Sequence, residues 1–147
     1  MTMTYQSQIE EWLCKKKSFI GCFPSKNLSK MSFPKYCCFA VNIEKHWVGI
    51  CIEDNFVYYF DSLLTSPMRK VMFDFLQKQK KVKGKKIFIV KRKIQNDDSI
   101  LCGVFVTLFL FYVNSVNSFT FFMRNFFVQN LKQNDKIALN MLNKIIL

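Results

Sequence analysis

The sequence has 147 residues, half of them hydrophobic, and a formal net charge of +12. This length suits one domain with a real core, and so apolar a composition excludes an intrinsically disordered chain. We therefore expect a single domain over residues 1–147.

The N-terminal part is expected to hold one helix and a turn-rich segment. Ser7 followed by Glu10 has the spacing of a capping box, which predicts a helix through about Lys16. The stretch that follows, to residue 35, contains Pro24 and Pro34, which predict loops. Because the opening residues are polar and acidic, we expect no secretory signal.

Three strand-like runs follow, over residues 36–43, 46–52 and 56–62. The acidic turn at 53–55 separates the last two, which predicts a hairpin. Apolar residues in these runs do not alternate cleanly with polar ones. Both faces of the sheet are therefore expected to be covered.

The second half is expected to be mostly helical. Ser66 as N-cap and Pro67 at the first position predict a helix to about Lys80. The remaining expected elements are a strand over 86–93, a polar loop over 95–99, a helix headed by Cys102, and helical stretches near 119–131 and 134–145. This order indicates an α+β domain with a small mixed or antiparallel sheet packed against helices.

The apolar run over residues 100–113 is too short for a typical membrane span and fits a buried core helix better. We expect no membrane contact from it. The chain has six cysteines but no pair spaced as Cys-x-x-Cys, and it has one histidine, so we expect no metal site. Reduced thiols in an intracellular compartment are the expectation.

A basic stretch over residues 78–93 carries nine cationic side chains and no acidic one. Such clusters bind nucleic acid or acidic protein surfaces, although a solvated lysine face is the simpler interpretation. The stretch has few aromatics, which argues against sequence-specific recognition. The candidate nucleic-acid-binding residues are Lys78, Lys80, Lys81, Lys83, Lys85, Lys86, Lys91, Arg92 and Lys93.

His46, the single histidine, begins a predicted strand, and Asp61 ends the next one. A lone histidine is more often structural, and an aspartate before Ser62 is more often a turn residue. In a hairpin centred on residues 53–55, however, His46 and Asp61 fall near one another at the same open end. An aspartate there can orient the imidazole and stabilise the imidazolium, which leaves the other ring nitrogen for a nucleophile.

Cys102 is the candidate nucleophile, because a helix N-terminus and an imidazolium both favour a thiolate. Gly103 would let a substrate backbone approach closely. Gln95 could donate an N–H to the oxyanion of a tetrahedral intermediate, together with the backbone N–H of Cys102. A buried, inert thiol is the alternative for Cys102. Taken together, the residues form a complete set for acyl transfer.

The motifs HW, FDSL and Q-x6-CG, in this order, resemble those of the adenovirus-type cysteine endopeptidases (adenains) and of the related proteases that cleave SUMO. Residues 19–42 resemble the adenain segment before its HW, and QNDDSILCGVF resembles its loop from Gln to Cys. The resemblance covers residues 5 to 115. It implies the clan's α+β fold, with the nucleophile at the N-terminus of a buried helix packed on a small sheet.

By this resemblance His46 is the general base, Asp61 its orienting acid, Cys102 the nucleophile and Gln95 the oxyanion donor. Trp47 would pack beside the site or line the substrate groove. The family cuts after small residues, commonly a glycine. Asp61 within YYFDSL looks more like the SUMO proteases, whereas Leu101, where those usually have aspartate, favours the viral group.

The chain also departs from the adenains. It is shorter, and its C-terminal part does not match. Adenains use DNA and a disulfide-linked viral peptide as activators, but no cysteine lies between Cys51 and Cys102 to bind such a peptide. The chemistry itself needs no cofactor, and non-specific DNA or a peptide stays a candidate activator.

Three functions are therefore weighed. The first is a monomeric viral endopeptidase that matures virion precursor proteins, located in the virion and the host nucleus. The second is a protease that removes a ubiquitin-like protein inside the cell. The third is an inactive domain that binds DNA or protein through its basic face, which predicts that Cys102→Ala changes nothing measurable.

Overall fold

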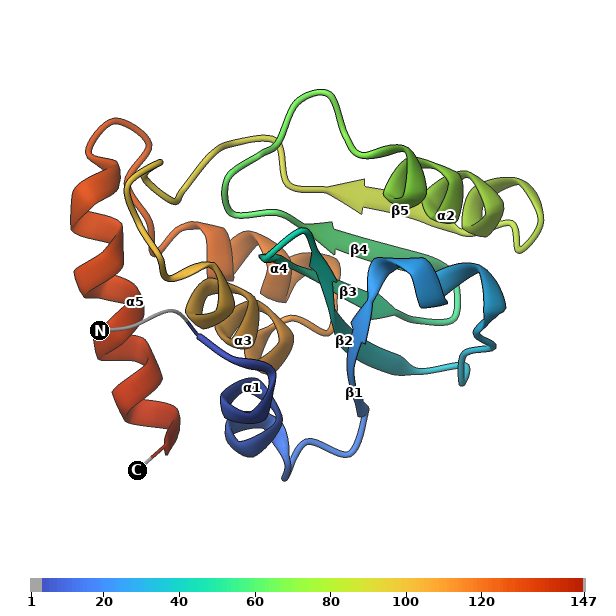
Figure 1. Cartoon of the computed structure of the whole chain (residues 1–147), viewed down its shortest axis with the longest axis horizontal. Helices are drawn as coiled ribbons and strands as arrows, with labels where there is room; N and C mark the ends of the chain where they lie inside the picture. The colour runs from blue at the N-terminus through green and yellow to red at the C-terminus, as the bar shows by residue number, and fades with distance from the viewer. Residues whose placement is uncertain (1–3, 147) are drawn as a thin grey trace.

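The computed structural model describes residues 4–146, which form a five-stranded mixed sheet with helices on both faces (Figure 1). The strands are β1 (Phe19–Pro24), β2 (Cys37–Ile43), β3 (His46–Ile52), β4 (Phe56–Phe60) and β5 (Lys86–Ile89), and they lie in the sheet in that order. The central pairs are antiparallel, and both edge strands are parallel to their neighbours. This confirms the predicted α+β class.

The helices are α1 (Gln6–Leu13), a 3-10 helix η1 (Ser25–Lys30), α2 (Lys70–Lys81), α3 (Cys102–Tyr112), α4 (Val116–Met123) and α5 (Leu131–Ile146). Side chains alternate across the sheet. Cys38, Ala40 and Tyr58 face the core that α3 shares with α1, α4 and α5, whereas Phe39 and Ile50 face α2 and η1. Both faces are therefore buried, as the strand pattern predicted.

Helix α3 is buried along nine of its eleven residues and lies across β3. The two backbones approach closely at Gly49, where an added Cβ would lie 2.7 Å from the ring of Phe109. Phe109 also stacks on Phe60 of β4, with ring centroids 4.8 Å apart. This packing holds the helix that begins at Cys102 against the strands that carry His46 and lead to Asp61.

Several predicted element boundaries are wrong. The first helix begins after Tyr5, whose N–H donates to Gln8 Oε1 at 2.7 Å, so Ser7 and Glu10 form no capping box. Helix α2 begins at Lys70 and not at Ser66, because the residues before it are held in a loop by hydrogen bonds to Asp61.

The segment before β2 was predicted as loops and contains β1 and η1. The strand β1 was not predicted because Gly21, at φ +127°, interrupts it and its pairing shifts register between Phe19 and Cys22. The last two helices occupy Val116–Met123 and Leu131–Ile146, so residues 124–130 are a connection rather than helix. None of the helices within residues 4–146 has the length and hydropathy to cross a bilayer.

Candidate active site

A tight turn places His46 at the start of β3. Residues Glu44 and Lys45 connect β2 to β3, and both have positive φ, 49° and 70°. Two-residue hairpin turns favour positive φ because their twist matches that of the flanking strands. His46 then pairs with Ile43 as the first residue pair of the hairpin.

Asp61 directly follows β4 in the chain, and its side chain contacts His46. Nε2 of His46 lies 2.7 Å from Oδ1 of Asp61, which confirms that the hairpin brings the two residues together. The N–H groups of Leu63 and Thr65 each donate to the Asp61 carboxylate at 3.0 Å. The carboxylate is buried, and these donors offset the cost of burying its charge.

The electrostatics of the pair favour two charged partners. Burial lowers the pKa of His46, but hydrogen bonds to Asp61 and Cys102 outweigh it and raise that pKa to about 9. Burial likewise raises the pKa of Asp61, while His46 and the Thr65 N–H outweigh it and hold that pKa below its usual value. Near neutral pH the pair is therefore an imidazolium beside a carboxylate.

Cys102 is the first residue of α3 and is 7% exposed. Because Nε2 of His46 is taken by Asp61, the other ring nitrogen is left for a second partner, and the Cys102 side chain is close enough to the imidazole to raise its pKa. The structure thus brings together three of the predicted residues.

Gln95 is buried in the loop that leads to α3. Its Oε1 accepts from Ser62 Oγ at 2.5 Å, and its Nε2 donates to the carbonyl of Ser99 at 3.0 Å. The N–H of Gln95 also donates to the carbonyl of Ser62 at 3.0 Å. Nε2 carries two hydrogens, so one remains for a substrate oxygen.

Ser62 and Ser99 were not among the residues predicted to form the site. Ser62 is fully buried and directly follows Asp61. Its hydrogen bond to Gln95 therefore joins the segment that carries Asp61 to the loop that carries Gln95. The sequence held one signal for each serine: Ser62 lies inside the FDSL motif, and Ser99 lies within the loop between Gln and Cys.

Trp47 and Gly103 are the two residues that were predicted to bind substrate. Trp47 is 5% exposed, and its Nε1 donates to the carbonyl of Thr4 at 3.2 Å. Trp47 was predicted either to pack beside the site or to line the substrate groove. In the structure its indole packs beside the site. An added Cβ at Gly103 would lie 2.5 Å from Cβ of Thr4. The space beside Gly103 therefore holds Thr4 in this structure, and the approach of a substrate backbone there stays a prediction.

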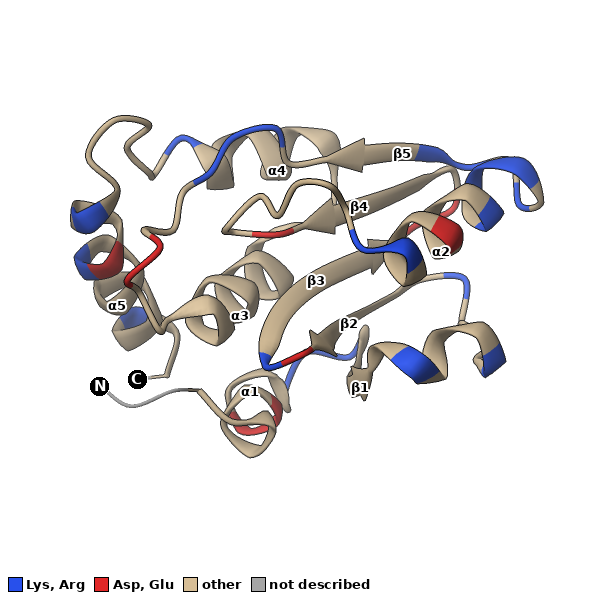
Figure 2. Cartoon of the chain, turned by 45° about the horizontal axis from the view of Figure 1, so that its top comes forward, with Lys and Arg blue, Asp and Glu red and all other residues tan. Residues whose placement is uncertain are grey.

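The basic stretch runs along the β5 edge of the sheet (Figure 2). Three of its side chains have partners inside the protein. Lys85 donates to the carbonyls of Glu53 and Asp54, Arg92 donates to the carbonyl of Met123, and Lys93 pairs with Asp97. Nucleic-acid binding stays a prediction for all nine residues, of which six are exposed: Lys78, Lys80, Lys81, Lys83, Lys86 and Lys91.

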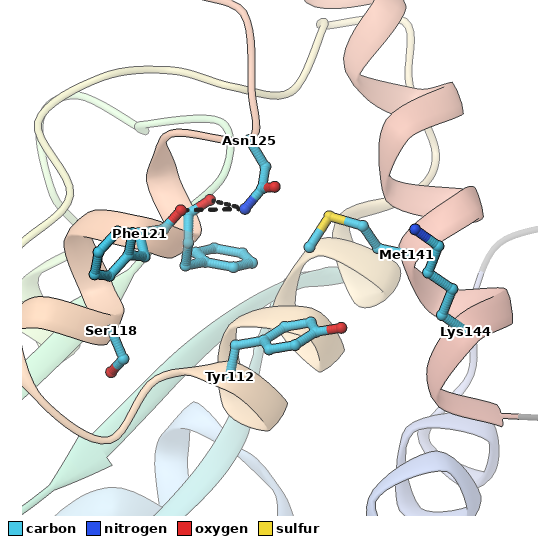
Figure 3. Close-up of a pocket in the computed structure, with 7 residues that line it drawn as sticks. Tyr112, Ser118, Phe121, Asn125, Met141 and Lys144 are labelled. Carbon is cyan, nitrogen blue, oxygen red and sulfur yellow. Dashed lines mark hydrogen bonds between the residues drawn. The ribbon is translucent and has the colours of Figure 1, made fainter.

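One cavity lies at the site and a second lies away from it. One of about 140 Å³ borders His46 and Asp61 and is also lined by Val48 and Met68. The other, of about 340 Å³, lies between α4, α5 and the far end of α3. Figure 3 shows Tyr112, Met141 and other side chains around it, and none of the predicted catalytic residues lines it. Within residues 4–146 no cluster of three or more acidic, cysteine or histidine side chains could hold a metal ion.

The arrangement is suited to acyl transfer. A thiol at a helix start lies beside an imidazole, a carboxylate orients that imidazole, and an amide donor lies in the adjoining loop. These groups can attack a carbonyl carbon, stabilise the resulting oxyanion and protonate a leaving group.

Comparison with known proteins supports this chemistry. The sequence model described as the Ulp1 protease family, C-terminal catalytic domain, matches residues 2–144. No curated protein matches the chain. Among solved structures, the central domain of the uncharacterized Lpg1148 protein from Legionella pneumophila is similar at 13% identity with a TM-score of 0.54, covering 97% of this chain and 96% of that one. This similarity shows the fold alone.

Two further solved structures are similar at lower scores. A de-sumoylating protease shares 18% identity with a TM-score of 0.44, over 96% of this chain and 62% of that one. A Ulp1-like SUMO protease catalytic domain from Chaetomium thermophilum shares 15% identity with a TM-score of 0.38, over 74% of this chain and 46% of that one. This chain thus spans less than two thirds of the length of either protease.

Proposed function

The chain belongs to the Ulp1 protease family, and from this premise we propose that it hydrolyses the bond after the C-terminal tail of a ubiquitin-like protein. The observation that carries the proposal is the 2.7 Å contact between His46 and Asp61 beside Cys102 at the start of α3. The family membership makes the cysteine-protease chemistry of these residues the natural assignment.

We assign the first half of the reaction as follows. The Cys102 thiolate attacks the carbonyl carbon, and an S–C bond forms while the carbonyl oxygen gains the charge. Gln95 Nε2–H and the backbone N–H of Cys102 donate to that oxygen. The His46 imidazolium then protonates the leaving amine as the C–N bond breaks, which leaves a thioester.

The second half restores the enzyme. Neutral His46 removes a proton from water, the hydroxide attacks the thioester carbonyl, and the S–C bond breaks. The released thiolate is again paired with the imidazolium, whose charge Asp61 stabilises. His46 gives one proton to the leaving amine and takes one from water, and the product carboxylic acid releases its own proton to solvent.

The proposal is tested with a ubiquitin-like protein that carries an electrophile in place of its C-terminal carboxylate. We expect a covalent adduct at Cys102, identified by mass spectrometry, with Cys102→Ala as the control. If no ubiquitin-like probe labels Cys102, while the unmodified enzyme is alkylated there by iodoacetamide at about pH 6, deconjugation is excluded and the nucleophile stands.

A viral endopeptidase that matures virion precursors is the second candidate. It is favoured by the resemblance of residues 19–42 and of the Gln95-to-Cys102 loop to the adenains. This candidate predicts cleavage within peptides after small residues, faster in the presence of DNA or a viral peptide. Absence of such cleavage, combined with labelling by a ubiquitin-like probe, would exclude it.

A further inference from the structure

We propose that the first turn of α5 positions the oxyanion donor, through Asn134 and Asp135. The segment that they hold, residues 94–101, is called the oxyanion loop below. This inference rests on the proposed function for its catalytic meaning. It assigns a role to the C-terminal helix, which lies beyond the segment that resembles the adenains.

Asn134 fixes the start of the oxyanion loop. It is fully buried, and its Nδ2 donates to the carbonyl of Ile94 at 2.8 Å and to that of Phe127 at 2.9 Å. Its Oδ1 accepts from the N–H of Phe127 at 2.7 Å. The side chain thus joins the residue before Gln95 to the connection that enters α5. Because a buried amide with these partners has no free rotation, it fixes the position of Ile94.

Asp135 fixes the end of the same loop through Ser99. Ser99 Oγ donates to Asp135 Oδ1 at 2.8 Å and accepts from the N–H of Leu101 at 3.2 Å. The carbonyl of Ser99 accepts from Gln95 Nε2 at 3.0 Å. Ser99 therefore contacts both the oxyanion donor and the residue before Cys102.

These contacts make the donor geometry depend on α5. Gln95 and the N–H of Cys102 must lie within hydrogen-bonding distance of the same oxygen to stabilise it. Ile94 and Ser99 flank Gln95 in the loop, and each is tied to a neighbouring residue of one helical turn. Release of either tie would let the donor move relative to Cys102, so Asn134 and Asp135 are positioning residues.

The test compares Asp135→Ala with Asp135→Asn. The alanine removes the acceptor of Ser99 Oγ, whereas asparagine keeps an oxygen there. We expect Asp135→Ala to lower kcat about tenfold with KM unchanged, because a misplaced donor weakens only the transition state. Asp135→Asn should restore most of kcat. Asp74→Ala, which removes an exposed carboxylate on α2, serves as the matched control and should match the wild type.

Hydrogen exchange at the Leu101 amide is measured on the same variants, since this amide donates to Ser99. It should quicken in Asp135→Ala and not in the control, while the amides of β3 stay unchanged. Asn134→Ala should quicken exchange at Gln95 as well. Hydrogen exchange can be measured even if the wild type cleaves no substrate. In that case the proposed function fails, but the exchange rates still show whether α5 positions the oxyanion loop.

Three results would overturn the inference. One is an active wild type whose kcat and Leu101 exchange are both unchanged in Asp135→Ala. The other is faster Leu101 exchange with unchanged kcat, because the loop would then be held by α5 without any effect on catalysis. A rise in KM at constant kcat would also overturn it, since that pattern reports lost substrate binding.

Discussion

The two ends of α3 each bring a buried cysteine near a cation, and only one of them resembles a catalytic site. At the N-terminal end Cys102 lies beside His46. At the C-terminal end Lys16 donates to the carbonyl of Leu110, and Cys38 and Cys51 face one another across β2 and β3. The neighbouring Cys51 outweighs burial and, with Lys16, lowers the pKa of Cys38 to about 7.

The difference lies in what surrounds each thiol. The cation at the C-terminal end is a lysine bonded to helix carbonyls, and the Cys51 thiol contacts the carbonyl of Val113. Carbonyls repel an oxyanion, whereas the N-terminal end offers N–H donors from Gln95 and the helix backbone. An acidic thiol is therefore not enough for acyl transfer: the groups that accept the substrate's developing charge must lie beside it.

The largest expected effect separates the two thiols. Cys102→Ala should lower kcat/KM roughly 10³-fold or more, because it removes the nucleophile. Cys38→Ala is the matched control at the other end of the helix, and its kcat/KM should equal that of the wild type. Both are measured with one fluorogenic substrate at several enzyme concentrations. Equal losses in the two variants would mean that the contrast between the ends of α3 is wrong.

Removal of the charge on Asp61 should have the next largest effect. We expect Asp61→Asn to lower kcat about 10³-fold near neutral pH, because the imidazolium that protonates the leaving group is no longer stabilised. His46 is protonated below its pKa of about 9, so wild-type activity should fall as the pH rises through that value. In the variant this alkaline limb should shift to lower pH.

The pH–rate profile of kcat checks this shift, with unfolding by urea as a control for folding. An alkaline limb that stays near pH 9 in Asp61→Asn would show that the carboxylate does not govern the protonation of His46.

Loss of the oxyanion donor should be smaller. Gln95→Leu is expected to lower kcat about 10²-fold with KM little changed, as for removal of a single donor in other acyl-transfer enzymes. Gln79→Leu, another buried glutamine but on α2, is the matched control and should leave kcat unchanged. A loss confined to KM would mean that Gln95 binds substrate and does not stabilise the oxyanion.

The smallest effect belongs to the C-terminal end of α3. Lys16→Met keeps the apolar stem but removes the ammonium that pairs with the Leu110 and Phe111 carbonyls. It should lower the free energy of unfolding by about 1 kcal/mol, as expected for a cation at a helix C-terminus, and leave kcat unchanged. Urea unfolding and the same kinetic assay check it. A large loss of kcat would show that this end takes part in catalysis.

Residues joined by local topology were predictable from sequence. His46 and Asp61 lie on one hairpin, so the position of its turn was enough to place them together. Cys102 was predictable because a polar loop gives way there to an apolar run, the pattern of a helix start. The two covered faces of the sheet followed from continuous apolar strands, whereas the strand directions were left open as mixed or antiparallel.

Contacts between distant segments were not predictable. Asn134 reaches Ile94 across 40 residues, and a single polar residue in an amphipathic helix gives no sign of such a partner. The edge strand β1 was missed because its pairing is irregular and glycine interrupts it. The viral hypothesis drew on residues 19–42, on the loop from Gln95 to Cys102 and on Leu101, whereas the Ulp1 family match extends over residues 2–144.

Gly49 has a consequence for the tolerance of the whole site. The base stands on the sheet and the nucleophile on the helix, so their separation is a distance between two layers. That spacing depends in part on Gly49, where β3 lies directly against Phe109 of α3. One additional methyl group there would have to push Phe109 aside or lift the helix away from His46. Gly49 has no side chain to take part in a reaction. Its small size therefore helps to keep the Cys102 thiol and the His46 imidazole close together.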